Sequence, residues 1–272
     1  MKAAWALLIF IIITTTAITA RLLSRETKPG PAPAESSESA TSTAADSLET
    51  PPLDLRIAFG YKDARPARFV GDRNERLVLI ERFTAECGAN DQACGFSRDP
   101  EDGDLLEKTV LRADGRYQTI YLRLTESSVG PDDVANRQDP FQKWQSEASE
   151  MNFLTGLEDA DFVLYIGHSR DGGGPAFTPP KILKNSHVDY NHYIRVREGA
   201  RKMIAVLEKT KSPPKVVGLL SCYSERHFVK ALNRAAPRTK LITNDHLLYY
   251  AEALVEAESA VGDFIQAQLA SH

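Results

Sequence analysis

The sequence has no excess of basic residues and shows no spacing typical of a metal site. Its 33 Lys and Arg residues are outnumbered by 37 Asp and Glu residues, which gives a net charge of −4 at pH 7. Proteins that bind nucleic acids usually carry a basic excess, so this balance disfavours a nucleic-acid partner. His187 and His192, with Asp189 between them, fit no zinc pattern and are expected in a loop. We therefore expect no nucleic acid, no metal and no cofactor.

Cysteine is also scarce, with only three among 272 residues. Cys87 and Cys94 lie close together in a stretch that contains Gly and Asn, whereas Cys222 is far from both. In an oxidising compartment two cysteines at this spacing form a small disulfide loop, so we predict the pair Cys87–Cys94. Cys222 is then a free cysteine, either a small buried apolar residue or a reactive thiol.

The first segment, 1–25, is predicted to be a signal peptide or a membrane anchor. Residues 3–20 are apolar or small and uncharged, a length between a signal-peptide core and a transmembrane helix. Basic residues flank the segment on both sides, so the charge rule leaves its orientation open. Together with the predicted disulfide, it indicates an extracytoplasmic protein, periplasmic or secreted, either released or anchored by residues 3–20. A membrane anchor with a cytosolic domain is the alternative.

The next segment, 26–52, consists mainly of Pro, Ala, Ser, Thr and Glu. Because it has almost no large apolar side chain, it cannot bury enough surface to order itself, and we expect a disordered linker. Residues 53–130 are predicted to be a strand-rich part of the chain, in which Asp114–Gly115 is a strong hairpin turn. The expected strands are Leu55–Phe59, Leu77–Phe83, Thr109–Leu111 and Tyr117–Leu124.

Residues 131–272 are predicted to form an α/β domain. It begins with a helix that ends at Gly156, on which the large apolar residues are expected to contact the core. These are Phe141, Trp144, Met151 and Phe153, with Ala148 among them. Strands are then expected at 161–167, 215–221 and 239–243, and helices around 193–209, 224–236 and 247–270. This alternation indicates a mostly parallel sheet covered by helices on both faces.

Two apolar strands of this domain end in residues that carry chemistry. His168 follows the stretch DFVLYIG, and Cys222 follows the stretch KVVGLLS. Ligands of open α/β sheets bind at the carboxyl edge of the strands, and a helix that starts after Cys222 would stabilise a thiolate there. If the two strands are parallel neighbours, His168 and Cys222 share one edge and can act as base and nucleophile.

The residues around this pair suggest supporting roles and one competing nucleophile. Backbone N–H groups near Ser169 and at Cys222 are candidates for an oxyanion hole. Asp171 could orient the histidine or bind substrate. The predicted oxyanion and substrate-binding residues are Ser169, Asp171, Gly172, Ser221 and Asn244.

Ser169 is itself a candidate nucleophile, because the stretch GHSRD nearly matches the nucleophile elbow of serine hydrolases. The elbow must lead directly into a helix, and here glycines and prolines follow instead. His227, one turn into the helix after Cys222, is a reserve base, and His246 is expected at the same sheet edge.

A histidine that ends one apolar strand, followed by a Ser-Cys pair that ends the next, resembles the caspase/legumain/gingipain group of cysteine peptidases. The resemblance covers about residues 161–244. It implies a caspase-like α/β fold, a dyad of His168 and Cys222, and cleavage of a peptide substrate through a thioester. The group usually has Gly after the histidine, whereas this chain has Ser169. A non-catalytic caspase-like binding domain and a serine hydrolase that uses Ser169 are the alternatives.

Overall fold

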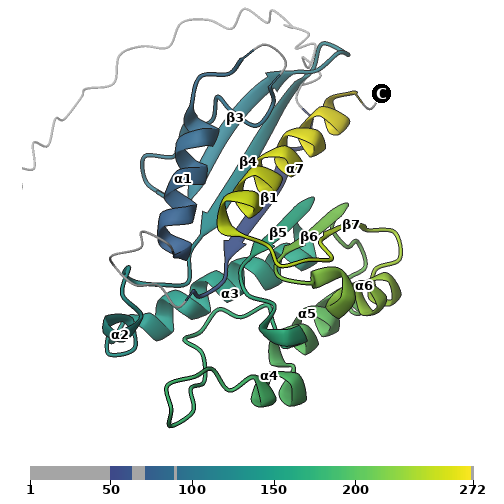
Figure 1. Cartoon of the computed structure of the whole chain (residues 1–272). Helices are drawn as coiled ribbons and strands as arrows, with labels where there is room; N and C mark the ends of the chain where they lie inside the picture. Colours follow the sequence, from purple (N-terminus) through teal and green to yellow (C-terminus); the bar gives the residue numbers. More distant parts are fainter. Residues whose placement is uncertain (1–49, 63–70, 89–90, 271–272) are drawn as a thin grey trace, which may run out of the picture. The chain divides into compact units, whose positions relative to one another are not determined.

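Seven strands form one mixed sheet in the order β2-β3-β4-β1-β5-β6-β7 (Figure 1). The computed structural model describes residues 50–62, 71–88 and 91–270, all of which belong to the unit Asp46–His272. The expected signal or anchor segment, 1–25, and residues 26–49 of the expected linker lie outside these residues. The strands are β1 Leu53–Phe59, β2 Ser97–Arg98, β3 Leu105–Leu111, β4 Tyr117–Thr125, β5 Phe162–Ile166, β6 Val216–Leu220 and β7 Lys240–Thr243.

Most of the sheet is parallel, as the alternation of strands and helices predicts. β1 pairs with β4 on one side and with β5 on the other, and β5, β6 and β7 follow in parallel register. β3 and β4 form an antiparallel hairpin through the turn at Asp114–Gly115, which confirms the predicted hairpin. The carboxyl ends of β4, β1, β5, β6 and β7 therefore lie at one edge of the sheet.

Helices cover both faces. α1 (Asp72–Thr84) and α7 (Tyr250–Ala270) pack together on one face, where a salt bridge of 2.8 Å joins Arg82 and Glu258 (Figure 1). The core of that face includes Phe59, Phe83 and Phe264. On the opposite face lie α3 (Gln142–Asp159), α5 (Glu198–Leu207) and α6 (Ser224–Ala235). α2 (Asp133–Asn136) and α4 (Tyr190–Val196) are short. An α/β fold covered on both faces is thereby confirmed.

The N-terminal part differs from the sequence prediction at one element. Residues 77–83, expected as a strand, belong to helix α1. Leu79, Ile80 and Phe83 are buried at helical spacing, while Leu77 and Val78 are exposed. The run opens with four consecutive apolar residues, Leu77–Ile80, whose periodicity does not separate a strand from a helix, and contact with the sheet and with α7 decides the outcome.

The apolar residues of α3 are also placed differently. Phe141, Trp144 and Met151 are exposed, and only Phe153 of the four large apolar residues is buried. The first part of the buried face is polar, with Gln142, Ser146, Ser149 and Asn152, and only its last turns are apolar, with Phe153 and Leu157. These side chains bind the end of β4 and the segment that follows it. The amide of Gln142, for example, donates to the Ser127 carbonyl at 2.6 Å. The expected core role of the exposed residues is therefore wrong.

The two nearby cysteines form the predicted disulfide, Cys87–Cys94, with a Cα–Cα separation of 5.2 Å. The bond closes the loop between α1 and β2, and Cys222 is free. A disulfide is compatible with an extracytoplasmic location. Among the described residues, no helix has both the length and the apolar character that crossing a membrane requires.

Candidate functional site

His168 and Cys222 lie at the same edge of the sheet. In the parallel pair β5–β6, Ile166 is opposite Leu220, and each of the two functional residues follows its strand by two positions. Both line one cavity of about 330 Å³. The expectation that the two strands are parallel neighbours is therefore confirmed, and the histidine and the thiol face a common space.

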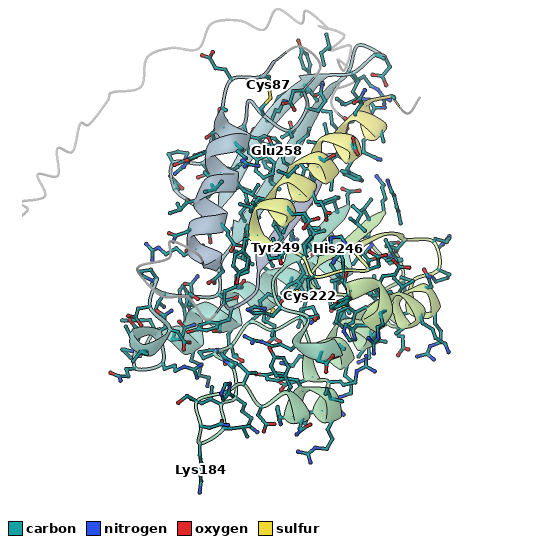
Figure 2. The ribbon with its side chains drawn as sticks, viewed as in Figure 1. Cys87, Lys184, Cys222, His246, Tyr249 and Glu258 are labelled. Carbon is teal, nitrogen blue, oxygen red and sulfur yellow. A yellow bond between two sulfur atoms is a disulfide. The ribbon has the colours of Figure 1, made fainter. Side chains whose placement is uncertain are left out.

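Cys222 is held in the short connection between β6 and α6. The next residue, Tyr223, has left-handed backbone dihedrals (φ 53°) and precedes the helix, and its N–H donates to the His246 carbonyl at 2.9 Å. The thiol lies 4.0 Å from the Leu248 carbonyl oxygen, beside the loop that carries His246 and Tyr249 (Figure 2). Cys222 is partly exposed and lies two residues before the first residue of α6.

His168 is fixed through its backbone by the preceding strand. The Tyr165 hydroxyl donates to the His168 carbonyl at 3.0 Å and accepts from the Ala176 N–H, also at 3.0 Å. This buried tyrosine thus ties the beginning and the end of the histidine loop together. Burial, together with the positive charges of Arg170 and Lys62, lowers the pKa of His168 to about 3. The imidazole is neutral at pH 7 and available to accept a proton.

A lysine that sequence reasoning missed completes the polar part of the cavity. Lys62, three residues beyond β1, lines the cavity and is only 2% exposed. Its ammonium pairs with the Glu75 carboxylate and lies 4.0 Å from the centre of the Tyr250 ring. The remaining lining is largely apolar: Ile166, Leu220, Leu247, Leu248, Tyr249 and Ala253, with Gly167. The sequence signal that could have found Lys62 is a lysine directly after a buried strand, at the edge where ligands bind.

Two buried carboxylates at the start of α1 support this lysine. Asp72 accepts hydrogen bonds from the N–H groups of Ser127 and Ser128 at 2.8 and 2.7 Å, and from the Ser128 hydroxyl at 2.7 Å. Burial raises the pKa of Asp72 to about 6 in spite of these bonds. Burial also raises the pKa of Glu75 and lowers that of Lys62. A charged group is thus held next to the cavity by a network built on three segments.

The predicted oxyanion and substrate-binding residues surround the dyad but are not among the residues that line its cavity. Ser169 is buried, Gly172 has a φ of 85° and Asp171 is exposed. Ser221 is buried, and its hydroxyl lacks a hydrogen-bond partner within the described part of the chain. Over the same residues, the backbone N–H groups of Ser169 and Cys222 make no hydrogen bond to a backbone carbonyl, and their role in an oxyanion hole remains a prediction.

Asn244 has a structural role. Its side-chain oxygen accepts from the Ser224 hydroxyl at 3.0 Å, and its amide donates to the His246 carbonyl at 2.8 Å. It therefore joins the start of α6, which follows Cys222 in the chain, to the loop after β7. A direct contact with substrate remains a prediction.

The two other candidate histidines, His227 and His246, do not line the cavity of Cys222. His227 lines a different cavity, between α5 and α6, and its ring is 3.7 Å from the Asp171 carboxylate. It is not among the residues that line the cavity of Cys222, because one turn of α6 carries it to the side of the glycine loop. His246 is half exposed and binds Asp245 and Glu252 at 3.1 and 3.0 Å. His227 therefore lines a different cavity from the thiol, and its role as a reserve base remains a prediction.

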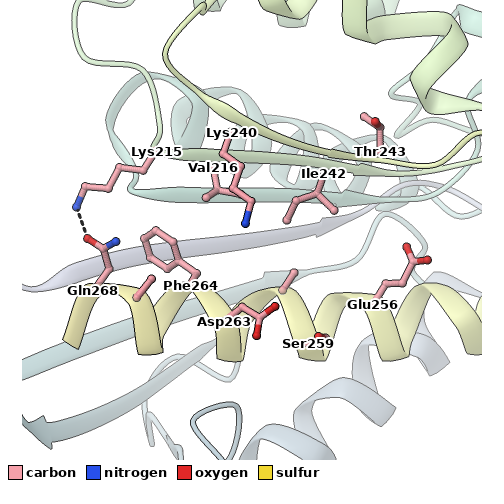
Figure 3. Close-up of a pocket in the computed structure, with 12 residues that line it drawn as sticks. Lys215, Val216, Lys240, Ile242, Thr243, Glu256, Ser259, Asp263, Phe264 and Gln268 are labelled. Atoms are coloured by element: carbon pink, nitrogen blue, oxygen red, sulfur yellow. Dashed lines mark hydrogen bonds between the residues drawn. The ribbon is translucent and has the colours of Figure 1, made fainter. Parts of the chain in front are cut away.

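A larger cavity of about 520 Å³ lies between α7 and the strands β6 and β7 (Figure 3). Lys215 donates across its end to Gln268 at 2.8 Å, and Asp263 and Glu256 project from α7. Neither a histidine nor a cysteine lines it, so it brings no nucleophile together with a base of that kind. The smaller cavity is therefore the candidate site because His168 and Cys222 line it, although its volume is smaller.

Comparison with models of known protein families and with curated proteins finds no match to this chain.

Proposed function

We propose that this protein is a cysteine peptidase-like hydrolase that cleaves peptide bonds with Cys222 as nucleophile and His168 as general acid and base. The observation that carries the proposal is the shared cavity at the carboxyl edge of two adjacent parallel strands. A thiol and an imidazole that line one cavity at this edge are the two groups that thioester chemistry needs. The resemblance to the caspase/legumain/gingipain group, in the order of the two residues and in the strand before each, points the same way.

The proposed reaction has two stages. The Cys222 sulfur attacks the carbonyl carbon of the scissile peptide as its proton passes to the His168 ring. The N–H groups of Ser169 and Cys222 stabilise the negative oxygen of the tetrahedral intermediate. His168 then gives the proton to the leaving amine, and a thioester remains on Cys222. Water then attacks the thioester as its proton passes to the same imidazole, the carbon–sulfur bond breaks to release the acid product, and the imidazole returns the proton to the Cys222 sulfur.

The electrostatics of His168 suit the acid step. A group with a depressed pKa is a weak base at rest but a strong acid once it carries a proton. It therefore gives up its proton readily to the amine, whereas its protonation depends on the simultaneous attack by sulfur. We expect the chemical step to be sensitive to any change in the two cations that surround the ring.

A second nucleophile has less support. Ser169 is buried, does not line the cavity, and is followed by a 3-10 turn, Arg170–Gly172, where an elbow requires an α-helix. Ser169→Ala is therefore the matched control: it should retain the Cys222-dependent activity.

The test uses the full chain and a mixture of peptides of varied sequence, with cleavage read by mass spectrometry. Cys222→Ala should abolish cleavage and labelling by iodoacetamide, and His168→Gln should abolish cleavage while labelling remains. Cleavage that survives Cys222→Ala would contradict the proposal. A thiol that labels normally in a protein that cleaves no peptide would favour the non-catalytic binding domain.

A further inference from the structure

A buried ammonium group in the cavity of Cys222 has no role in the chemistry described so far. Lys62 is 2% exposed, and a lysine is seldom buried unless it is paired. It is held by the Glu75 carboxylate, by the face of the Tyr250 ring and by the end of β1. Removing an ammonium from water is costly, so a fold that only needed packing here would be served better by an apolar residue.

We propose that Lys62 is the counter-ion of the Cys222 thiolate and that it, not His168, stabilises the ionised nucleophile. Both side chains line the same cavity, and Cys222 is among the groups that interact electrostatically with the ammonium. The proposal rests on the proposed function only in taking Cys222 as the working thiol. In this proposal Lys62 is a positioning residue, because its positive charge acts on the Cys222 sulfur before any substrate binds.

The groups that face the pair of Lys62 and Cys222 come from three elements. Glu75 and Asp72 approach from α1, and His168 approaches from the end of β5. Tyr250 lies over the ammonium from α7, and Cys222 itself comes from the end of β6. Among the charged neighbours of Lys62, Glu75 is the strongest, followed by Asp72 and Cys222.

The same charges explain why the histidine does not take this role. Lys62 and Arg170 both disfavour a positive charge on the His168 ring. An imidazolium beside a buried ammonium would add like charges at short range, whereas a neutral imidazole adds none. Lys62 therefore stabilises the sulfur once it is ionised, and the neutral imidazole is left free to take up the proton of the thiol.

The test measures the rate of alkylation of Cys222 by iodoacetamide between pH 5 and 10 in the full, oxidised chain, which has Cys222 as its free thiol in the described part. No substrate is needed. Lys62→Met should move the half-maximal pH upward by at least one unit and slow alkylation about tenfold below it, because only the thiolate reacts. Lys62→Arg should restore most of the shift.

The control variants separate this role from a merely structural one. Lys62→Met leaves Glu75 buried without a partner, so the double variant Lys62→Met/Glu75→Leu removes both charges, and it should show the same upward shift. Lys215→Met removes an exposed lysine outside the cavity and should leave the profile unchanged. His168→Gln should leave the half-maximal pH within about half a unit of the wild-type value.

An unchanged profile in folded Lys62→Met or in the folded double variant would overturn the proposal. So would an upward shift of more than one unit in His168→Gln, because the imidazole would then be the counter-ion. If the profiles move as expected but no peptide is cleaved, the counter-ion stands and the peptidase proposal fails.

Discussion

The Tyr165 hydroxyl donates a hydrogen bond of 3.0 Å to the carbonyl oxygen of His168, three residues further along the chain. The hydroxyl oxygen of Tyr165 in turn accepts a hydrogen bond from the Ala176 N–H at 3.0 Å. Gly60 and Gly167 leave the room that this hydroxyl occupies: a Cβ at either position would lie 2.2 or 2.4 Å from it. The buried Tyr165 side chain of β5 therefore sets where the histidine loop leaves the sheet. Loss of its hydrogen bonds should lower the rate of the chemical step.

Tyr165→Phe tests this role. The change leaves the His168 carbonyl and the Ala176 N–H without a partner inside the fold, which should cost about 1–3 kcal/mol of unfolding free energy. Because the imidazole would shift with its backbone, kcat should fall by about tenfold or more. Urea unfolding and peptide cleavage measure the two effects. Tyr117→Phe is the control, since Tyr117 is exposed, and it should change stability by less than about 0.5 kcal/mol. Equal effects of the two changes would show that the hydroxyl bonds of Tyr165 are not needed.

Gly60→Ala tests the close packing against the same side chain. A Cβ at residue 60 would lie 2.2 Å from the Tyr165 hydroxyl and 2.7 Å from the Ala176 carbonyl oxygen, so backbone must move. Overpacking of this kind should lower the unfolding free energy by about 1–3 kcal/mol. Gly103→Ala is the matched control, because nothing lies within 4 Å of a Cβ there. Thermal unfolding of both variants gives the comparison, and a Gly60→Ala protein as stable as the control would contradict the packing described.

His168→Gln tests the electrostatics of the imidazole through the pH dependence of stability. Because the pKa of His168 is lowered to about 3 in the folded protein, the unfolded chain binds a proton first as the pH falls below about 6.5. The wild-type protein should therefore lose stability relative to the variant as the pH falls through this range. The expected change is at most about 2 kcal/mol between pH 7 and pH 5, and urea titrations at each pH measure it. A difference between the two proteins that does not vary with pH would contradict a depressed pKa.

The strands that carry the site could be predicted because each is a short apolar run with clear ends. β5 and β6 are buried along their whole length, so Phe162–Ile166 and Val216–Leu220 read as interior strands from composition alone. A parallel arrangement then places His168 and Cys222 at one edge. That inference required only chain order and the rule for connections between parallel strands.

What could not be predicted depends on partners far away in the sequence. α3 buries Ser149 because Thr125, 24 residues earlier, and the Phe59 carbonyl, 90 residues earlier, bind its polar face. Lys62 was missed because its buried position depends on Glu75 and Tyr250, from two helices on one face of the sheet. Hydrophobic periodicity records how apolar each residue is, not which polar groups find a partner.

The disulfide gives the last prediction, which concerns both stability and the state of Cys222. Cys87 and Cys94 are seven positions apart, so reduction should lower the unfolding free energy by about 2–3 kcal/mol, as expected for a loop of this size. The ammonium of Lys108, a residue of β3, donates to the Cys94 carbonyl at 2.7 Å. This bond should confine the loss of structure on reduction to the loop and its neighbours. Thermal unfolding with and without a reductant measures the change.

Cys87→Ser/Cys94→Ser should show the same decrease in stability without a reductant. Alkylation of the unfolded chain, followed by mass spectrometry, should modify one cysteine before reduction and all three after it, since the chain has three in total. Cys222 lies at the carboxyl edge of β6, away from this loop, so its alkylation rate in the folded Cys87→Ser/Cys94→Ser protein should match that of the oxidised wild type. Three modified cysteines before reduction would mean that the pair is not joined, and an altered rate at Cys222 would mean that the loop and the thiol cavity are coupled through α7.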